Sequence, residues 1–132
     1  MDKKFLKKII AQSLEDLQVI SACCSEATVK LSEIKYLSSN KIFLISLLRQ
    51  DKENENNENS INSVIKFEFI ESSKSKNINQ NNPDLLLELL AIDVFKRDQN
   101  FEITLLFSEN RFITLTAEVI EATLEDQKFE ND

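Results

Sequence analysis

Two adjacent cysteines, Cys23 and Cys24, are the residues in this sequence whose types first suggest chemistry. A thiol can take part in redox reactions or bind a metal, and a Cys-x-x-Cys spacing lets two sulfurs converge on one ion. Adjacent cysteines do not converge in this way, because a disulfide between neighbours is strained. The sequence has no further cysteine. We therefore interpret the pair as one thiol buried on a helix face with its neighbour at the edge, since a free cysteine packs as a small apolar group.

Carboxylates within apolar strand-like runs form a second group, Glu68, Glu88 and Asp93. Two carboxylates that converge in a pocket can act as general acid and base. Glu88 and Asp93 are five residues apart, however, so a regular strand would point them to opposite faces. We expect each carboxylate to face solvent or to pair with a nearby basic side chain, because buried charges are rare unless paired. The nearby basic residues are Lys66, Lys96 and Arg97.

Lysines cluster at the N-terminus, at Lys3, Lys4, Lys7 and Lys8, and could bind an anionic ligand, RNA or a membrane surface. Only Phe5 lies among them, whereas a surface that stacks bases needs more than one ring. The whole chain has a net charge of −7, which argues against a general nucleic-acid binder. The simpler interpretation is that these lysines form a solvated face of the first predicted element. A basic N-terminus on an otherwise acidic chain would also favour head-to-tail contact between molecules.

Two missing residue types exclude the common catalytic designs, because the sequence has no histidine and no glycine. The usual general base and zinc ligand are therefore absent, and a phosphate-binding glycine loop is excluded. No nucleophile motif surrounds a serine, and 73–76 (Ser-Lys-Ser-Lys) lies in a polar segment that resembles a solvated linker. We predict a protein that is not an enzyme and that has no catalytic residues, no metal site and no cofactor. Without glycine, tight turns must use Asn and Asp to reach left-handed conformations.

The segments that must position these residues belong to one predicted domain, residues 1–132. The polar stretches 51–60 and 72–84 are predicted to be flexible loops, and the acidic segment 127–132 a frayed tail. The longest apolar runs are far shorter than the roughly 20 residues that span a bilayer. The N-terminus resembles neither a signal nor a transit peptide, and the cysteine usage fits a reducing compartment, so we expect a cytoplasmic protein without membrane contact.

One helix is predicted over Leu14–Ser25, where Ser13 and Asp16 resemble a capping box. Alternating or continuous apolar residues predict strands elsewhere. The predicted strands are Phe5–Ala11, Thr28–Leu37, Lys41–Gln50, Ser63–Ser72, Leu85–Phe95, Phe101–Phe107 and Arg111–Val119. The stretch Glu118–Asp126 fits a helix or a bulged strand, and we favour the strand slightly.

The order β-α-β-β-β-β-β-β predicts an α+β fold. We expect a mainly antiparallel, strongly curved sheet or partly open barrel of six to seven strands over the helix in the N-terminal half. Lys41–Gln50 and Leu85–Phe95 are apolar on both faces, so both faces need a cover. One helix of about three turns is too small to supply it. Barrel closure or a second subunit must do so, and we predict a homodimer.

Three functions fit these features. The first is a non-enzymatic interaction domain, in which the exposed apolar sheet surface meets a protein partner. The second is a small-molecule-binding domain or weak enzyme using carboxylates, with a barrel-like cavity lined by phenylalanine and gated by the loops at 51–60 and 72–84. The third, nucleic-acid or membrane binding through the N-terminal lysines, is the least favoured.

The runs Leu6–Ala11, Ser13–Arg49 and Arg111–Asp126, together with the LLLELLAI strand, resemble an uncharacterised alphaproteobacterial family, domain of unknown function 2948. The resemblance covers nearly the whole chain and rests on patterns of apolar and acidic residues. It implies a bacterial, cytoplasmic, stand-alone domain, without an assigned activity or established site residues. The absence of glycine and the asparagine-rich loops depart from the family pattern, which leaves the geometry of the loops open.

Overall fold

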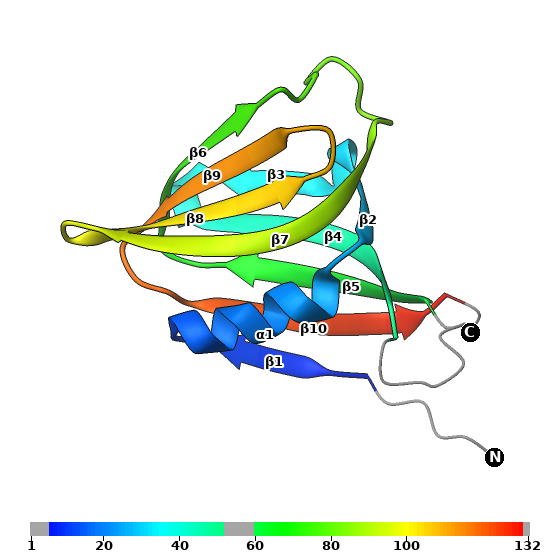
Figure 1. Cartoon of the computed structure of the whole chain (residues 1–132), viewed down its shortest axis with the longest axis horizontal. Coiled ribbons are helices and arrows are strands. Elements are labelled where there is room, and N and C mark those ends of the chain that lie inside the picture. Colours follow the sequence, from blue (N-terminus) through cyan, green and yellow to red (C-terminus); the bar gives the residue numbers. More distant parts are fainter. Residues whose placement is uncertain (1–5, 52–59, 131–132) are drawn as a thin grey trace.

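A computed structural model describes residues 6–51 and 60–130 of the chain (Figure 1). The described residues form one α-helix, two 3₁₀ turns and ten strands of a single antiparallel sheet. In chain order the elements are β1 (Lys8–Ala11), α1 (Leu14–Cys24), β2 (Ala27–Lys30), η1 (Leu31–Glu33), β3 (Ile34–Leu37), η2 (Ser38–Asn40), β4 (Ile42–Gln50), β5 (Ser60–Phe67), β6 (Ile70–Lys76), β7 (Leu86–Arg97), β8 (Asn100–Phe107), β9 (Arg111–Ala117) and β10 (Ala122–Phe129).

Helix α1 confirms the predicted helix and ends one residue before its expected end. Ser13 is the N-cap, and its Oγ accepts a hydrogen bond of 3.1 Å from the backbone N–H of Asp16. The Asp16 carboxylate accepts a return bond from the backbone N–H of Gln12, so the expected box closes one residue earlier than usual. Acidic side chains in the first turn also suit the positive end of the helix dipole.

The strands follow the order β1-β10-β5-β4-β2-β7-β8-β9-β6, with β3 pairing β4 beside this path. The α+β class and the mainly antiparallel sheet are confirmed. The expected six to seven strands are wrong, because the sheet has ten. The expected strong curvature and partly open barrel are also wrong, since the sheet is neither closed nor strongly curled.

The additional strands arise where a predicted strand breaks in two. Within Thr28–Leu37 the turn η1 separates β2 from β3, and within Ser63–Ser72 a bend separates β5 from β6. Phe69 stands at that bend in the left-handed region, with φ of 59°. Its carbonyl accepts a bond from the N–H of Glu118, so this bend lies beside the connection between β9 and β10.

Several predicted loop boundaries are corrected by the structure. Strand β6 extends to Lys76, so the first part of the predicted loop 72–84 is paired with β9. Strand β10 extends to Phe129, so the predicted tail 127–132 begins inside the sheet. The predicted loop 51–60 lies mostly outside the described residues, and Ser60 already begins β5. In the ambiguous segment Glu118–Asp126 the helix alternative is wrong, because the part from Ala122 onward is strand.

The core lies on one face of the sheet and receives alternate side chains from most strands. On β8 and β9 the buried residues follow the predicted alternation. Helix α1 adds Leu17, Ile20 and Cys24 to this core. In Figure 1 the helix runs between β1 and β7, and Ser21 Oγ accepts a 2.9 Å bond from the N–H of Ile92 on β7.

The two strands predicted to be apolar on both faces differ in how well they are covered. The outward side chains of β4 are half-buried from Ile42 to Leu48. On β7 the outward side chains Leu86, Leu90 and Phe95 are exposed. The described chain therefore leaves the outer face of β7 uncovered.

Left-handed backbone occurs at seven described residues, none of them glycine. The expected residue types account for three of the seven, namely Asn77, Asp98 and Asn110. Glu26, Lys41, Phe69 and Glu109 fill the others, although a Cβ atom costs about 1 kcal/mol or more there. The geometry of each connection therefore overrides the local preference of these side chains.

Candidate functional site

Both cysteines lie in the last turn of α1. Cys24 is fully buried in the core and Cys23 is half-buried at the helix flank, which confirms the interpretation as a packed thiol with a neighbour at the edge. Within residues 6–51 and 60–130, no three His, Cys, Asp or Glu side chains are grouped so as to hold a metal ion.

The carboxylates on β7 do not point to opposite faces as a regular strand would require. A bulge between Leu89 and Ala91 shifts the register, so Glu88 and Asp93 are both exposed on the outer face. Their ladder partners are Thr28 on β2 and Thr104 on β8, respectively, so the two carboxylates lie along one strand rather than converging. Glu68 lies apart from them at the bend after β5, where its N–H bonds to the carbonyl of Glu121.

The N-terminal lysines do not form one described cluster. Lys3 and Lys4 lie outside the described residues. Lys8 is exposed on β1, whereas Lys7 is half-buried and hydrogen-bonds through its backbone. The polar segment 73–76 is the end of strand β6 rather than a linker.

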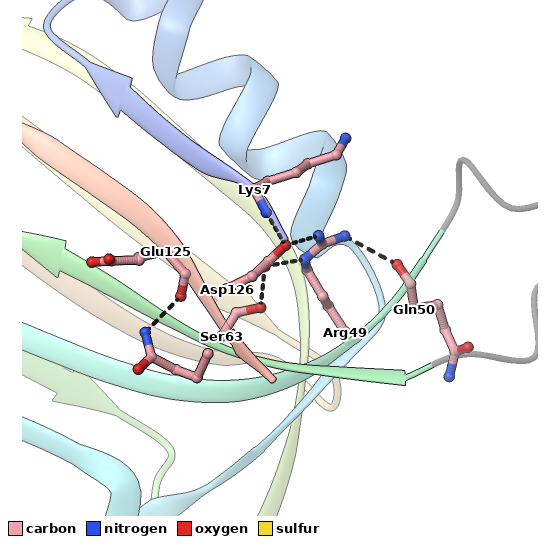
Figure 2. A network of polar contacts seen from close by, with 7 residues as sticks. Lys7, Arg49, Gln50, Ser63, Glu125 and Asp126 are labelled. Carbon is pink, nitrogen blue, oxygen red and sulfur yellow. Dashed lines mark hydrogen bonds and ion pairs between the residues drawn. The ribbon is translucent and has the colours of Figure 1, made fainter. Parts of the chain in front are cut away.

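The structure brings together a group of residues that sequence reasoning missed, a buried ion pair between Arg49 and Asp126. Figure 2 shows the Arg49 guanidinium of β4 facing the Asp126 carboxylate of β10. Arg49 donates from Nε at 3.0 Å and from Nη2 at 2.6 Å, so the pair is bidentate. The same carboxylate accepts bonds from Ser63 Oγ at 2.6 Å and from the backbone N–H of Lys7 at 2.8 Å. Arg49 also donates from Nη1 to the carbonyl of Gln50.

The electrostatics of the pair favour the charged forms of both residues. Burial alone would raise the pKa of Asp126, but hydrogen bonds from Arg49, Ser63 and Lys7 outweigh burial and hold this pKa below its ordinary value. Burial alone would lower the pKa of Arg49, but its hydrogen bonds to Asp126 and the nearby negative charge raise it instead. Both side chains are almost completely excluded from solvent. The group therefore acts as a clamp that joins β4, β5, β10 and the residue before β1.

A signal for this clamp was present in the alternation of the strands. Arg49 continues the inward series of β4, Ser63 precedes the inward Ile65 on β5, and Asp126 follows the inward Leu124 on β10. Three polar residues at inward positions of three strands indicate a buried polar group, because an isolated buried charge is costly.

A depression of about 440 Å³ lies beside the clamp, between α1 and the residue before β1. Arg49 and Lys7 line one side, and helix residues Glu15, Val19 and Cys23 line the other, with Gln18 and Ala22. Two further depressions, of about 390 and 330 Å³, lie over the outward residues of β4 and β5. None of the three depressions is lined by phenylalanine, so none matches the expected phenylalanine-lined cavity.

Exposed apolar residues are frequent in the first part of the described chain. Of the ten large apolar residues that are exposed, four lie between residues 6 and 19. We call these four the N-terminal corner, and they are Leu6, Ile10, Leu14 and Val19. Their exposed fractions range from 42% to 57%.

Comparison with known protein families gives a match over most of the chain. The model of the family described as "Protein of unknown function (DUF2948)" matches residues 7–131. The chain belongs to this family. The match confirms the resemblance seen in the sequence, and it covers every strand and the helix of the DUF2948 domain. No curated protein and no solved structure matched the chain. Across the described part of the domain, no helix has the length and apolar character needed to cross a bilayer.

Proposed function

We propose that this DUF2948 domain is a non-enzymatic protein-interaction domain that works as a homodimer. The N-terminal corner carries the proposal, because its four exposed apolar side chains belong to β1, the residues before it and α1, which follow one another directly in the chain. Apolar groups gathered on a soluble domain mark contact surfaces, since covering them with another protein releases water from apolar area.

The placement of the polar residues supports a role without catalysis. The carboxylates of β7 lie along an outer face, and the buried Arg49, Ser63 and Asp126 already bind one another. A general acid or base needs to reach a bound substrate with its acidic or basic group free to exchange a proton. Asp126 does not meet this requirement, because its carboxylate already accepts bonds from three residues.

A second copy is the partner that the corner fits best. In a two-fold dimer the same patch meets itself, so a patch that carries both charges can complement itself. The same stretch of chain carries both charges, with Lys7 just before β1, Lys8 at its start, and Glu15 and Asp16 in the first turn of α1.

The test is the molar mass in solution, measured by light scattering over a wide dilution series at moderate salt. We expect twice the chain mass of 15.3 kDa at high concentration. Val19→Glu should shift the series toward monomer, because it places a charge in the covered patch. Phe95→Glu is the matched control, since Phe95 is as exposed but lies on β7, and it should leave the mass unchanged. A wild-type monomer at every concentration would refute the homodimer.

Small-molecule binding is a second candidate, favoured by the depression between α1 and Lys7. Its volume of about 440 Å³ lies in the range of ligand pockets, and it combines apolar Val19 and Ala22 with charged Glu15. Filling it by Ala22→Trp should abolish ligand-induced thermal stabilisation in a screen of small metabolites. Stabilisation that survives this substitution would place the ligand elsewhere.

A further inference from the structure

Strand β1 ends the sheet with one row of backbone groups that faces no other strand (Figure 1). Lys8 lies opposite Glu125 in the ladder with β10, and the neighbouring pair is bonded, because the N–H of Asp126 donates to the carbonyl of Lys7 at 2.9 Å. Bonded and non-bonded pairs alternate in an antiparallel ladder. The N–H and C=O groups of Lys8 and Ile10 therefore point away from β10. Within the described residues they meet no hydrogen-bonding partner on that side.

Strand β6, at the other end of the sheet, is better protected against pairing with a further strand than β1 is. Ile70 at the start of β6 donates its N–H to the carbonyl of Lys41, and its own carbonyl accepts from Tyr36 Oη at 2.9 Å. Lys74 and Lys76 add exposed charges farther along β6. Such charges discourage pairing between edges. Strand β1 also carries one exposed lysine, Lys8, but its other outward side chain, Ile10, is apolar and 57% exposed.

We propose that β1 pairs antiparallel with β1 of a second copy, with the two-fold axis at Ile9. This proposal rests on the homodimer proposed above and names its contact. Lys8 then lies opposite Ile10 of the partner subunit, and each outward N–H of one strand meets an outward carbonyl of the other. The Ile10 side chain packs against the aliphatic stem of Lys8 of the partner subunit on the outer face.

The outward groups of two β1 strands complement each other in this register but not in the neighbouring registers. An axis at Lys8 would place two lysines directly opposite each other, which is unfavourable. An axis at Ile10 would place Lys8 opposite Gln12, whose N–H is already bonded to Asp16. A shift by one residue would turn the core-facing side chains of one copy toward the outer face of the other. In this register the exposed Ile10 of each copy is covered by the Lys8 stem of the other, so the edge supplies its own cover, and a second copy is therefore assigned as the occupant.

The first experiment removes one outward donor by Ile10→Pro. The N–H of Ile10 is not used in the ladder with β10, and proline is tolerated at such positions of edge strands. Symmetry removes the bond twice, so we expect the dimer dissociation constant to rise about 30-fold, or about 2 kcal/mol. Ile10→Ala keeps the donor and is the matched control, with a smaller rise. A dissociation constant unchanged by the proline would refute the β1 contact.

The second experiment tests the register with single cysteines in the Cys23→Ser, Cys24→Ala background. Non-bonded antiparallel partners have Cα atoms about 4.5 Å apart, a separation that a disulfide can span. Ile9→Cys should therefore link two chains on oxidation by glutathione disulfide, whereas Ile10→Cys should not. A dimer in which neither or both variants link would overturn this register and leave the homodimer standing. A monomeric wild-type chain would overturn the homodimer itself.

Discussion

Replacing Asp126 by asparagine should destabilise the domain by about 3–5 kcal/mol, because it leaves the buried Arg49 cation without its counter-charge. The geometry supports this magnitude. An asparagine Oδ1 in place of the carboxylate Oδ1 keeps the bonds from Arg49 Nε and Ser63, but its NH₂ group then faces two donors, Arg49 Nη2 and the N–H of Lys7. Two charge-assisted bonds are lost, each worth about 1.5–3 kcal/mol.

The assay is urea unfolding followed by circular dichroism at fixed protein concentration, because self-association would shift the apparent stability. The double substitution Arg49→Met with Asp126→Leu is the informative control. It removes both charges and keeps the volume, so it should recover most of the stability that Asp126→Asn loses. A loss below about 1 kcal/mol for Asp126→Asn would refute the argument that the guanidinium depends on this carboxylate.

The same pair predicts how stability depends on pH. The pKa of Asp126 is lower in the folded protein than its ordinary value of 3.8. A depressed carboxyl pKa adds stability that is complete above the unfolded-state value and is lost as the pH falls through the folded-state value. The contribution of Asp126 should therefore be constant from neutral pH down to about 5 and should fall in more acidic solution. The difference in unfolding free energy between wild type and Asp126→Asn should narrow over that acidic range.

Two further substitutions test local features by urea unfolding. Ser13→Ala removes the N-cap acceptor of α1 and should cost about 1 kcal/mol, whereas Ser13→Asp should keep most of the stability. Glu109→Gly relieves a left-handed residue at the hairpin between β8 and β9 and should stabilise by about 0.5–1 kcal/mol, because the Glu109 side chain that it removes is 73% exposed and its ion pair with Arg111 is therefore screened by solvent. A loss of stability for Glu109→Gly would mean that this ion pair outweighs the backbone strain.

Sequence patterns correctly predicted the helix and those strands whose formation depends on residues within the same segment. The helix was predicted because Ser13 caps it and apolar residues recur on its inner face. Strands β8 and β9 were predicted because apolar residues recur at every second position, from Ile103 to Phe107 and from Ile113 to Ala117. Strands β3 and β4 were also predicted, as parts of the apolar runs Thr28–Leu37 and Lys41–Gln50, and the structure pairs them antiparallel.

Breaks within strands could not be predicted, because their cause lies elsewhere in the sheet. Nothing in the type of Phe69 favours a left-handed conformation, and the bend is fixed by backbone bonds to the connection after β9. The bulge between Leu89 and Ala91 likewise has no signal in the local sequence. It places Asp93 on the same face as Glu88, where opposite faces were expected. Strand number and sheet shape depend on these breaks, so the expected barrel of six to seven strands failed with them.

The clamp at Asp126 bears on the proposed interface as well as on stability. Among the described strands β1 pairs with β10 alone, and the Asp126 carboxylate binds the N–H of Lys7, next to the outward groups of Lys8. A buried ion pair is weak evidence for stability, because apolar residues of similar volume often do as well. Its position suggests a role in setting register, since sliding β1 along β10 would break the bond to Lys7. We therefore expect Arg49→Met with Asp126→Leu to keep the fold but weaken self-association, whereas a purely structural pair would leave self-association unchanged.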